Sequence, residues 1–215
     1  VVAEVEKLLA DYPAPDGVDL EVGGTVEDQG DAFGDLGTLL ILIVILVYIV
    51  MATQFESLKF PFIIMFTIPF AFTGVFLALW MTSTPLSLIA LIGAIMLVGI
   101  VTKNGIVMVD YMNLLIERGS GVFDAVIAGG KSRLRPVLMT SFTTILGMLP
   151  LAIGTGAGSE TWQPMGIAVI GGLTFSTILT LFIVPVLYSI LVNRSQRKER
   201  EKLARLSAEH QASKH

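Results

Sequence analysis

The chain has 215 residues, of which 53% are hydrophobic and 15% are charged. Soluble domains carry about 25% charged residues, so this composition excludes an ordinary soluble protein and indicates an integral membrane protein. Cysteine is absent, which excludes disulfide bonds and thiolate metal sites, and the acids gather at the beginning, where residues 1–36 hold ten acids and one base.

Residues 1–33 have the pattern of a small soluble α/β segment. Apolar residues recur at helical spacing in 1–10, two prolines and a glycine follow in 12–17, and residues 18–22 alternate apolar and acidic side chains like a half-buried strand. A helix capped by Thr25 is expected to run through Phe33 into the membrane. Because two elements cannot form a core alone, and because the sequence begins without methionine, we expect Val1 to be an internal position of a longer chain.

Five segments are long and apolar enough to cross a bilayer, which predicts an all-α polytopic membrane protein. Pro69 is expected to kink the second span. Residues 118–135 predict a short amphipathic helix at the membrane interface, after which Pro136 starts the fourth span. Residues 194–215 are expected to form a polar cytoplasmic tail. The predicted spans are residues 36–55, 60–81, 86–112, 136–153 and 161–193, within a transmembrane domain of residues 34–193.

Basic residues in the connections predict the orientation of these spans. Lys59, the 118–135 connection and the tail carry Lys and Arg, whereas the turns at 82–85 and 154–160 carry none. By the positive-inside rule, the basic connections and the C-terminus lie in the cytoplasm. The acidic N-terminal segment is then expected on the outside.

Lys103 is the anomaly of the sequence, because it interrupts a long uncharged stretch inside the third span. No charged residue lies between Lys59 and Lys103, and a charge at such a depth costs at least about 2.5 kcal/mol. An intramembrane ionisable residue predicts an ion or proton pathway, and the alternative is a structural lysine that extends to the interface. Asp110 is on the same helix face but about 10 Å away along the axis, so the counter-charge is expected outside this chain. Asp110 itself has a second interpretation, an interfacial carboxylate beside Arg118, Arg133 or Arg135.

Polar and small residues are notable in the third, fourth and fifth spans. Thr140 and Thr144 share a face of the fourth span and either line a water path or bond to their own helix carbonyls. Asn104, beside Lys103, either bonds to another helix for packing or takes part in function. In the fifth span, small residues at four-residue spacing predict a helix-packing seam, namely Ala168, Gly172, Ser176 and Thr180. No arrangement of catalytic residues, no metal-spaced cluster and no nucleic-acid motif occurs in the sequence, so we expect no enzyme activity, no cofactor and no nucleic-acid partner.

Three motifs together resemble the resistance-nodulation-division (RND) efflux pumps, specifically their hydrophobe/amphiphile (multidrug) branch. They are residues 99–111 (GIVTKNGIVMVDY), 133–141 (RLRPVLMTS) and 154–159 (GTGAGS), in the family's order and spacing. The resemblance implies that the five spans are the last five of a twelve-helix fold. It also implies that residues 1–33 end a periplasmic porter subdomain.

The resemblance also implies a role for individual residues. The lysine matching Lys103 faces two aspartates of the missing N-terminal half, whose protonation drives the transport cycle, and the residues matching Arg133 and Thr140 belong to the same relay. When those aspartates take up protons, Lys103 is expected to move toward Asn104 or Thr140 and so to shift helices. We therefore assign a candidate proton relay to Lys103, Asn104, Asp110, Arg133 and Thr140. The heavy-metal branch usually lacks this lysine, which favours organic substrates.

The resemblance also implies an assembly and its partners. Pumps of this family are homotrimers in the lipid of the bacterial inner membrane, and they are joined to a periplasmic adaptor protein and an outer-membrane channel. The first hypothesis is thus the C-terminal transmembrane portion of a proton-driven exporter of drugs or other amphiphilic compounds. The alternative is a truncated, non-transporting membrane module that packs on a partner and regulates or scaffolds it.

Overall fold

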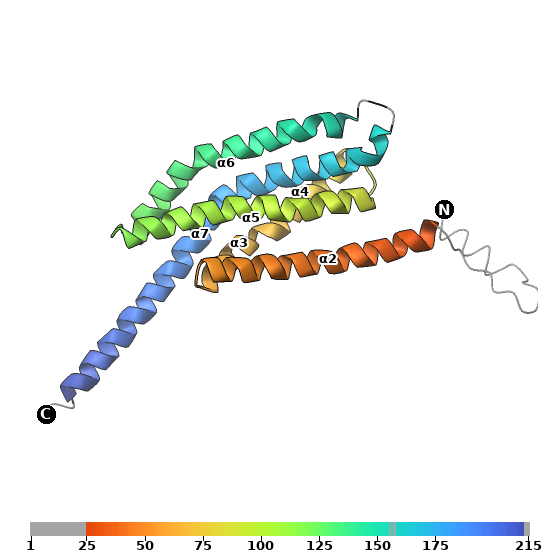
Figure 1. Cartoon of the computed structure of the whole chain (residues 1–215). Coiled ribbons are helices and arrows are strands. Elements are labelled where there is room, and N and C mark those ends of the chain that lie inside the picture. The colour runs from red at the N-terminus through yellow and green to blue at the C-terminus, as the bar shows by residue number, and fades with distance from the viewer. Residues whose placement is uncertain (1–24, 155, 157, 213–215) are drawn as a thin grey trace, which may run out of the picture.

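The computed structural model describes residues 25–154, 156 and 158–212 (Figure 1). Within these residues every regular element is a helix, and five helical segments are long and apolar enough to cross a membrane. The predicted all-α chain with five apolar segments is confirmed for this part. The predicted α/β segment falls mainly on residues 1–24, which lie outside the described residues. The helices are α2 (Thr25–Gln54), α3 (Lys59–Met65), α4 (Thr67–Met81), α5 (Leu88–Glu117), α6 (Val122–Ile153) and α7 (Ser159–Ala212).

The second span consists of two helices, α3 and α4, which are separated at Phe66. Pro69 explains the interruption, because it has no N–H to donate to the carbonyl of Met65 and its ring crowds that carbonyl. The kink predicted from Pro69 is therefore confirmed, and it takes the form of a break one turn before the proline.

The prediction of a separate interfacial helix before Pro136 is wrong. α6 is continuous from Val122 to Ile153 and holds both Pro136 and Pro150 inside it. A proline removes one helical hydrogen bond, yet membrane helices tolerate the loss because neighbouring helices and local adjustments satisfy the freed carbonyl. α6 accordingly bends over the bundle and does not restart (Figure 1).

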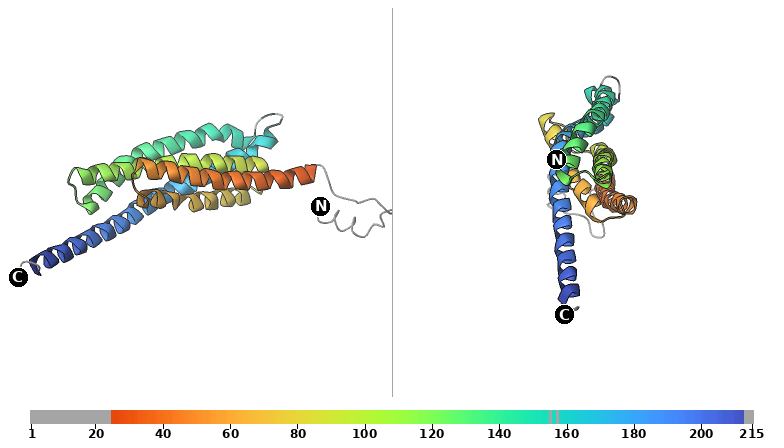
Figure 2. Two further views of the ribbon diagram at one scale, coloured as in Figure 1. Left: turned by 60° about the horizontal axis from the view of Figure 1, so that its bottom comes forward. Right: turned by 90° about the vertical axis from the view of Figure 1, so that its left-hand side faces the viewer.

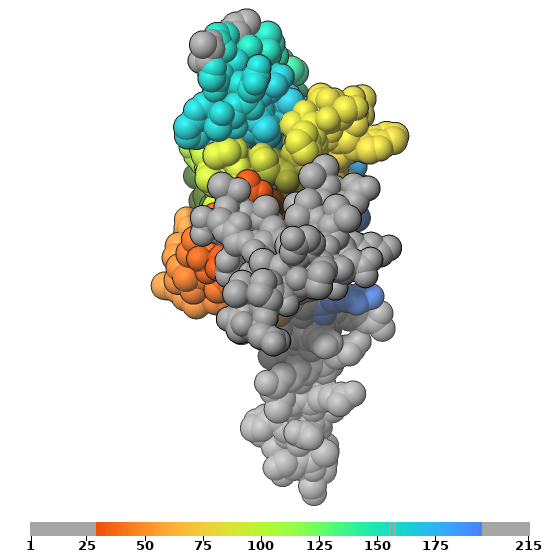
Figure 3. Space-filling model, turned by 90° about the vertical axis from the view of Figure 1, so that its right-hand side faces the viewer, coloured from red at the N-terminus to blue at the C-terminus, as the bar shows by residue number. Residues whose placement is uncertain are grey.

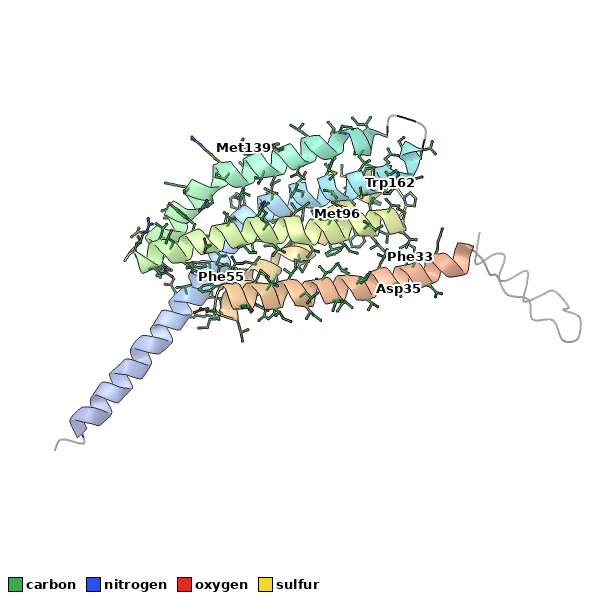
Figure 4. All side chains as sticks on the ribbon, in the orientation of Figure 1. Phe33, Asp35, Phe55, Met96, Met139 and Trp162 are labelled. Atoms are coloured by element: carbon green, nitrogen blue, oxygen red, sulfur yellow. The ribbon has the colours of Figure 1, made fainter. Side chains whose placement is uncertain are left out.

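α7 is the central helix, and it packs against α4, α5 and α6. Its last turns extend alone beyond the other helices in every view (Figures 1 and 2). α2 lies at the periphery, against α3 and α5, and most of its side chains are exposed. The outward side of α6 is also open, with Met139 pointing away from the bundle (Figure 4).

Two apolar clusters form the core, one toward each end of the bundle. The first joins α4, α5 and α7 through residues such as Val75, Leu97 and Leu173. The second joins α2, α3, α5 and α7 around Met108 and Tyr188. Figure 3 looks onto the end where α4 turns into α5 and α6 turns into α7.

Candidate functional site

Lys103 lies on a side of α5 that the other described helices leave open. Its side chain is exposed and lines a cavity of about 330 Å³ between α2 and α5. Apart from Lys103 and Thr102 the lining side chains are apolar, among them Leu46 and Val50 of α2. Within the described part of the chain no carboxylate pairs with the ammonium group. An ammonium in such surroundings requires a counter-charge or water at this groove.

Contacts between polar side chains fix how α5, α6 and α7 are placed along the axis of the bundle relative to one another. We call the position of a residue along this axis its height. The guanidinium carbon of Arg133 on α6 is 4.5 Å from the ring centroid of Tyr111 on α5. α5 and α6 run in opposite directions, and Lys103 and Ser141 are each eight residues from that stack, about 12 Å along a helix axis. Lys103 and Ser141 therefore lie at a similar height in the bundle.

α7 gives the same height by an independent contact. The Tyr188 hydroxyl donates to Asn113 Oδ1 at 2.5 Å, and the hydroxyls of Ser141 and Thr177 lie 2.9 Å apart inside the bundle. On α5, Thr102 precedes Asn113 by the same number of residues as Thr177 precedes Tyr188 on α7. Thr102 therefore lies opposite Thr177. A layer of buried hydroxyls thus lies at the depth of Lys103, formed by Thr102, Ser141 and Thr177.

The predicted hydroxyl stripe of α6 bonds to its own helix. Thr140 donates to the carbonyl of Val137, and Thr144 donates to the carbonyl of Thr140. Thr140 is nevertheless exposed and is the neighbour of Ser141, so it lies close to the height of Lys103. Asn104 is half-buried and makes no hydrogen bond through its side chain to any residue that the structure describes.

Asp110 lies apart from the arginines. It is exposed and lines a cavity of about 310 Å³ that it shares with Glu56, Asn113 and Glu117. It forms no ion pair among the described residues, and Arg133 stacks on Tyr111 instead. The second interpretation of Asp110, an interfacial carboxylate beside Arg118, Arg133 or Arg135, therefore finds no ion pair among the described residues. Of the five candidate relay residues, the structure brings Lys103 and Thr140 to a similar height, with Asn104 next to Lys103 in the chain. Asp110, on α5, and Arg133, on α6, lie in separate surroundings nearer the connection between these two helices.

The four small residues of the predicted seam on α7 are all buried. A Cβ on Gly172 would lie 2.1 Å from Leu97 Cδ2 and 3.1 Å from the carbonyl oxygen of Ala71. Side chains and backbone of α5 and α4 thus approach this face of α7 closely. Thr180 differs from the others, since its buried hydroxyl has no partner among the described residues.

Sequence reasoning missed the contacts between helices that fix this geometry. In the sequence, Ser141 and Tyr111 stand out only as members of the motifs 133–141 and 99–111. Their partners lie 36 and 22 residues away in the chain, and helical periodicity carries no information about such pairs. An unusual cluster of Tyr, Asn and Arg near the ends of apolar spans was the available signal.

Within the described residues, five apolar helical segments and a lysine in the middle of one of them, without a carboxylate partner there, are typical of a polytopic α-helical membrane protein with a functional charge inside its spans. The chain belongs to the AcrB/AcrD/AcrF family, whose family model matches residues 1–192. It therefore belongs to the RND efflux transporters, as its three motifs predicted.

Several relatives carry names of different function. The swarming motility protein SwrC of Bacillus subtilis is 37% identical over 92% of this chain and 19% of its own length. The cobalt-zinc-cadmium resistance protein CzcA of Cupriavidus metallidurans is 38% identical over 86% of this chain and 17% of its own. The multidrug resistance protein MdtC of Erwinia tasmaniensis is 37% identical over 92% and 19%. The chain thus spans less than a fifth of the length of these relatives.

A solved structure has the same helical arrangement. The crystal structure of a heavy metal efflux pump, crystal form II, superimposes with a TM-score of 0.77 at 30% identity, covering 89% of this chain and 19% of that pump. The identities to the metal-resistance and multidrug relatives are almost equal, so overall similarity does not separate the two branches.

Proposed function

We propose that the chain is the C-terminal transmembrane portion of a proton-driven RND exporter and that Lys103 is its charge switch. The single observation that carries the proposal is the ammonium group of Lys103, which lines an apolar groove without a carboxylate among the described residues. Such a cation is tolerable when anions from another part of the pump cover the groove. The matching position in the family's pumps faces two aspartates.

The coupling follows from electrostatics. While the facing carboxylates are ionised, Lys103 is attracted to them and holds α5 toward the other half. When they take up protons the attraction falls, and the ammonium moves toward the polar side chains at its own height, Asn104 and Thr140. Because α5 packs on α7, a shift of α5 is transmitted to the core. Arg133 and Asp110 complete the proposed relay toward the cytoplasmic end.

For the substrate we propose organic amphiphiles, because the three motifs resemble the multidrug branch and MdtC, named a multidrug resistance protein, is 37% identical to this chain. A second candidate is metal export, which the similarity to CzcA and to the heavy metal efflux pump favours. A panel of dyes, detergents and the ions Co²⁺, Zn²⁺ and Cd²⁺, tested for resistance in cells that lack other exporters, separates the two.

We further propose that the complete protein is a homotrimer of the bacterial inner membrane that works with a periplasmic adaptor and an outer-membrane channel. Its N-terminal segment is then periplasmic and its C-terminus cytoplasmic, as the basic connections favour. The non-transporting module remains the alternative to be tested with it.

Lys103→Met in the full-length protein tests the proposal. We expect the variant to reach the membrane in normal amount and to lose export, because methionine keeps the length of the side chain and removes its charge. Lys131→Met, at an exposed position of α6, is the matched control and should export normally. Export by Lys103→Met at the wild-type rate would refute the charge switch, and absence of export by the wild-type protein would favour the non-transporting module.

A further inference from the structure

The contact between Arg133 and Tyr111 joins α6 to α5 by a charge and a ring. The guanidinium carbon is 4.5 Å from the ring centroid, well within the distance at which a cation is attracted to an aromatic face. Arg133 is half-buried, and its Nε is fully buried with no hydrogen-bond partner among the described residues. The ring therefore supplies the main interaction of this charge within the part of the chain that the structure describes.

The contact with Tyr111 also directs Arg133 away from the carboxylate of Asp110. Asp110 is the residue before Tyr111, and consecutive residues of an α-helix point about 100° apart. The Asp110 side chain lines the cavity with Glu56 and Glu117, whereas Arg133 lies over the neighbouring ring. Asp110 is the acid nearest to Tyr111 in sequence, so a guanidinium freed from the ring would have this carboxylate next to its former partner, and a bidentate Arg–carboxylate pair is strong in a poorly hydrated place.

We propose that Tyr111 is a positioning residue for proton coupling, because its ring holds the Arg133 guanidinium on one face of α5 and keeps it from pairing with Asp110. This inference rests on the proposed function of Arg133 and Asp110 in the relay. The stack keeps both charges separate and the Nε–H directed into the interior. It also sets the relative height of α5 and α6, on which the common depth of Lys103 and Ser141 depends.

A graded series at position 111 of the full-length protein in proteoliposomes tests the proposal. The series is Tyr, Phe, 3,5-difluoro-Phe, 3,4,5-trifluoro-Phe and Leu, because fluorination weakens the negative ring face while nearly preserving the size of the ring. We expect the rate of proton-coupled transport to be kept by Phe, to fall stepwise with fluorination and to fall about five-fold with Leu, within a range of about two- to thirty-fold. Phe142→Leu, at an exposed position of α6, should leave the rate unchanged.

Two outcomes of the transport assay would overturn the inference while leaving the proposed function intact. One is wild-type transport by Tyr111→Leu. The other is a flat rate across the fluorinated rings with a loss only in Tyr111→Leu, which would mean that the ring merely packs. Absence of proton-coupled transport in the wild-type protein would instead refute the proposed function itself. A double-mutant cycle of Tyr111→Leu and Arg133→Gln in thermal unfolding checks the stack separately: non-additive shifts are expected, and additive shifts would show that the two side chains do not interact.

Discussion

Replacing Gly74 with alanine should separate α4 from α7, because at this position the two backbones are in contact. A Cβ on Gly74 would lie 2.6 Å from Phe175 Cβ, 2.8 Å from the carbonyl oxygen of Gly171 and 3.0 Å from Gly172 Cα. Carbon atoms in favourable contact are about 3.5–4.0 Å apart, so the helices would have to move apart by about 1 Å. None of the three atoms is the end of a flexible side chain, so no rotamer change relieves the clash.

The cost of Gly74→Ala is the difference between two effects. Overpacking costs up to about 3 kcal/mol, and alanine regains about 1 kcal/mol of helix propensity over glycine. The expected net loss is about 2 kcal/mol, which lowers the unfolding midpoint by about 4–8 °C when the bundle of this chain unfolds as a unit of its own, and by less when a larger part of the full-length protein unfolds with it. The effect also reaches the core, because α7 packs against α5 and α6 as well.

The measurement is thermal unfolding of the detergent-purified full-length protein, followed by tryptophan fluorescence, since Trp80 lies on α4 and Trp162 on α7. Gly130→Ala on α6 is the control, because a Cβ there would meet no atom within 4 Å; its midpoint should be unchanged or slightly raised. A midpoint of Gly74→Ala equal to that of Gly130→Ala would show that the α4–α7 contact is not as close as the structure has it.

Two further predictions concern buried hydroxyls. Thr177→Val removes the partner of the buried Ser141 hydroxyl and should cost about 1–3 kcal/mol. Thr180→Val replaces a hydroxyl that has no partner within the described part of the chain and should be neutral or stabilising; equal losses in the thermal midpoints of both variants would contradict this reasoning. Tyr188→Phe keeps the stack on Phe60 but leaves Asn113 Oδ1 without its donor, so we expect a loss of about 1–3 kcal/mol in the same unfolding assay. Asn113→Leu in the Tyr188→Phe background should recover part of that loss, and a further loss would mean that Asn113 has a second role.

The sequence was sufficient for the parts of the fold that depend on one helix at a time. Hydropathy located the five apolar segments, and the missing N–H of Pro69 predicted the interruption of the second. The same rule failed at Pro136, because a proline's effect on a membrane helix depends on whether neighbouring helices satisfy the freed carbonyl. That information lies in the packing of α6 against α5 and α7, which a linear pattern does not contain.

Of the candidate site, the sequence predicts only those residues whose chemical type is unusual for their stretch of the chain. Lys103 could be found because a charge in an apolar span is costly wherever the other helices lie. Asp110 has no such constraint, since a carboxylate near a helix end suits either an arginine or water. Its true neighbours, Glu56 and Glu117 around one cavity, follow from how α2 and α5 meet.

The exposed surface of the bundle poses two different problems, and only one of them requires another protein segment. Exposed apolar side chains such as Ile41 on α2 and Phe142 on α6 are satisfied by lipid. Lys103 is not, because lipid tails offer its ammonium neither an acceptor nor a counter-charge. The groove that it lines is bounded by Leu46 and Val50 of α2 as well as by α5. Any segment that neutralises Lys103 must therefore contact α2 and α5 together, and it must bring its acidic side chains to the height that Ser141 and Thr177 mark inside the bundle.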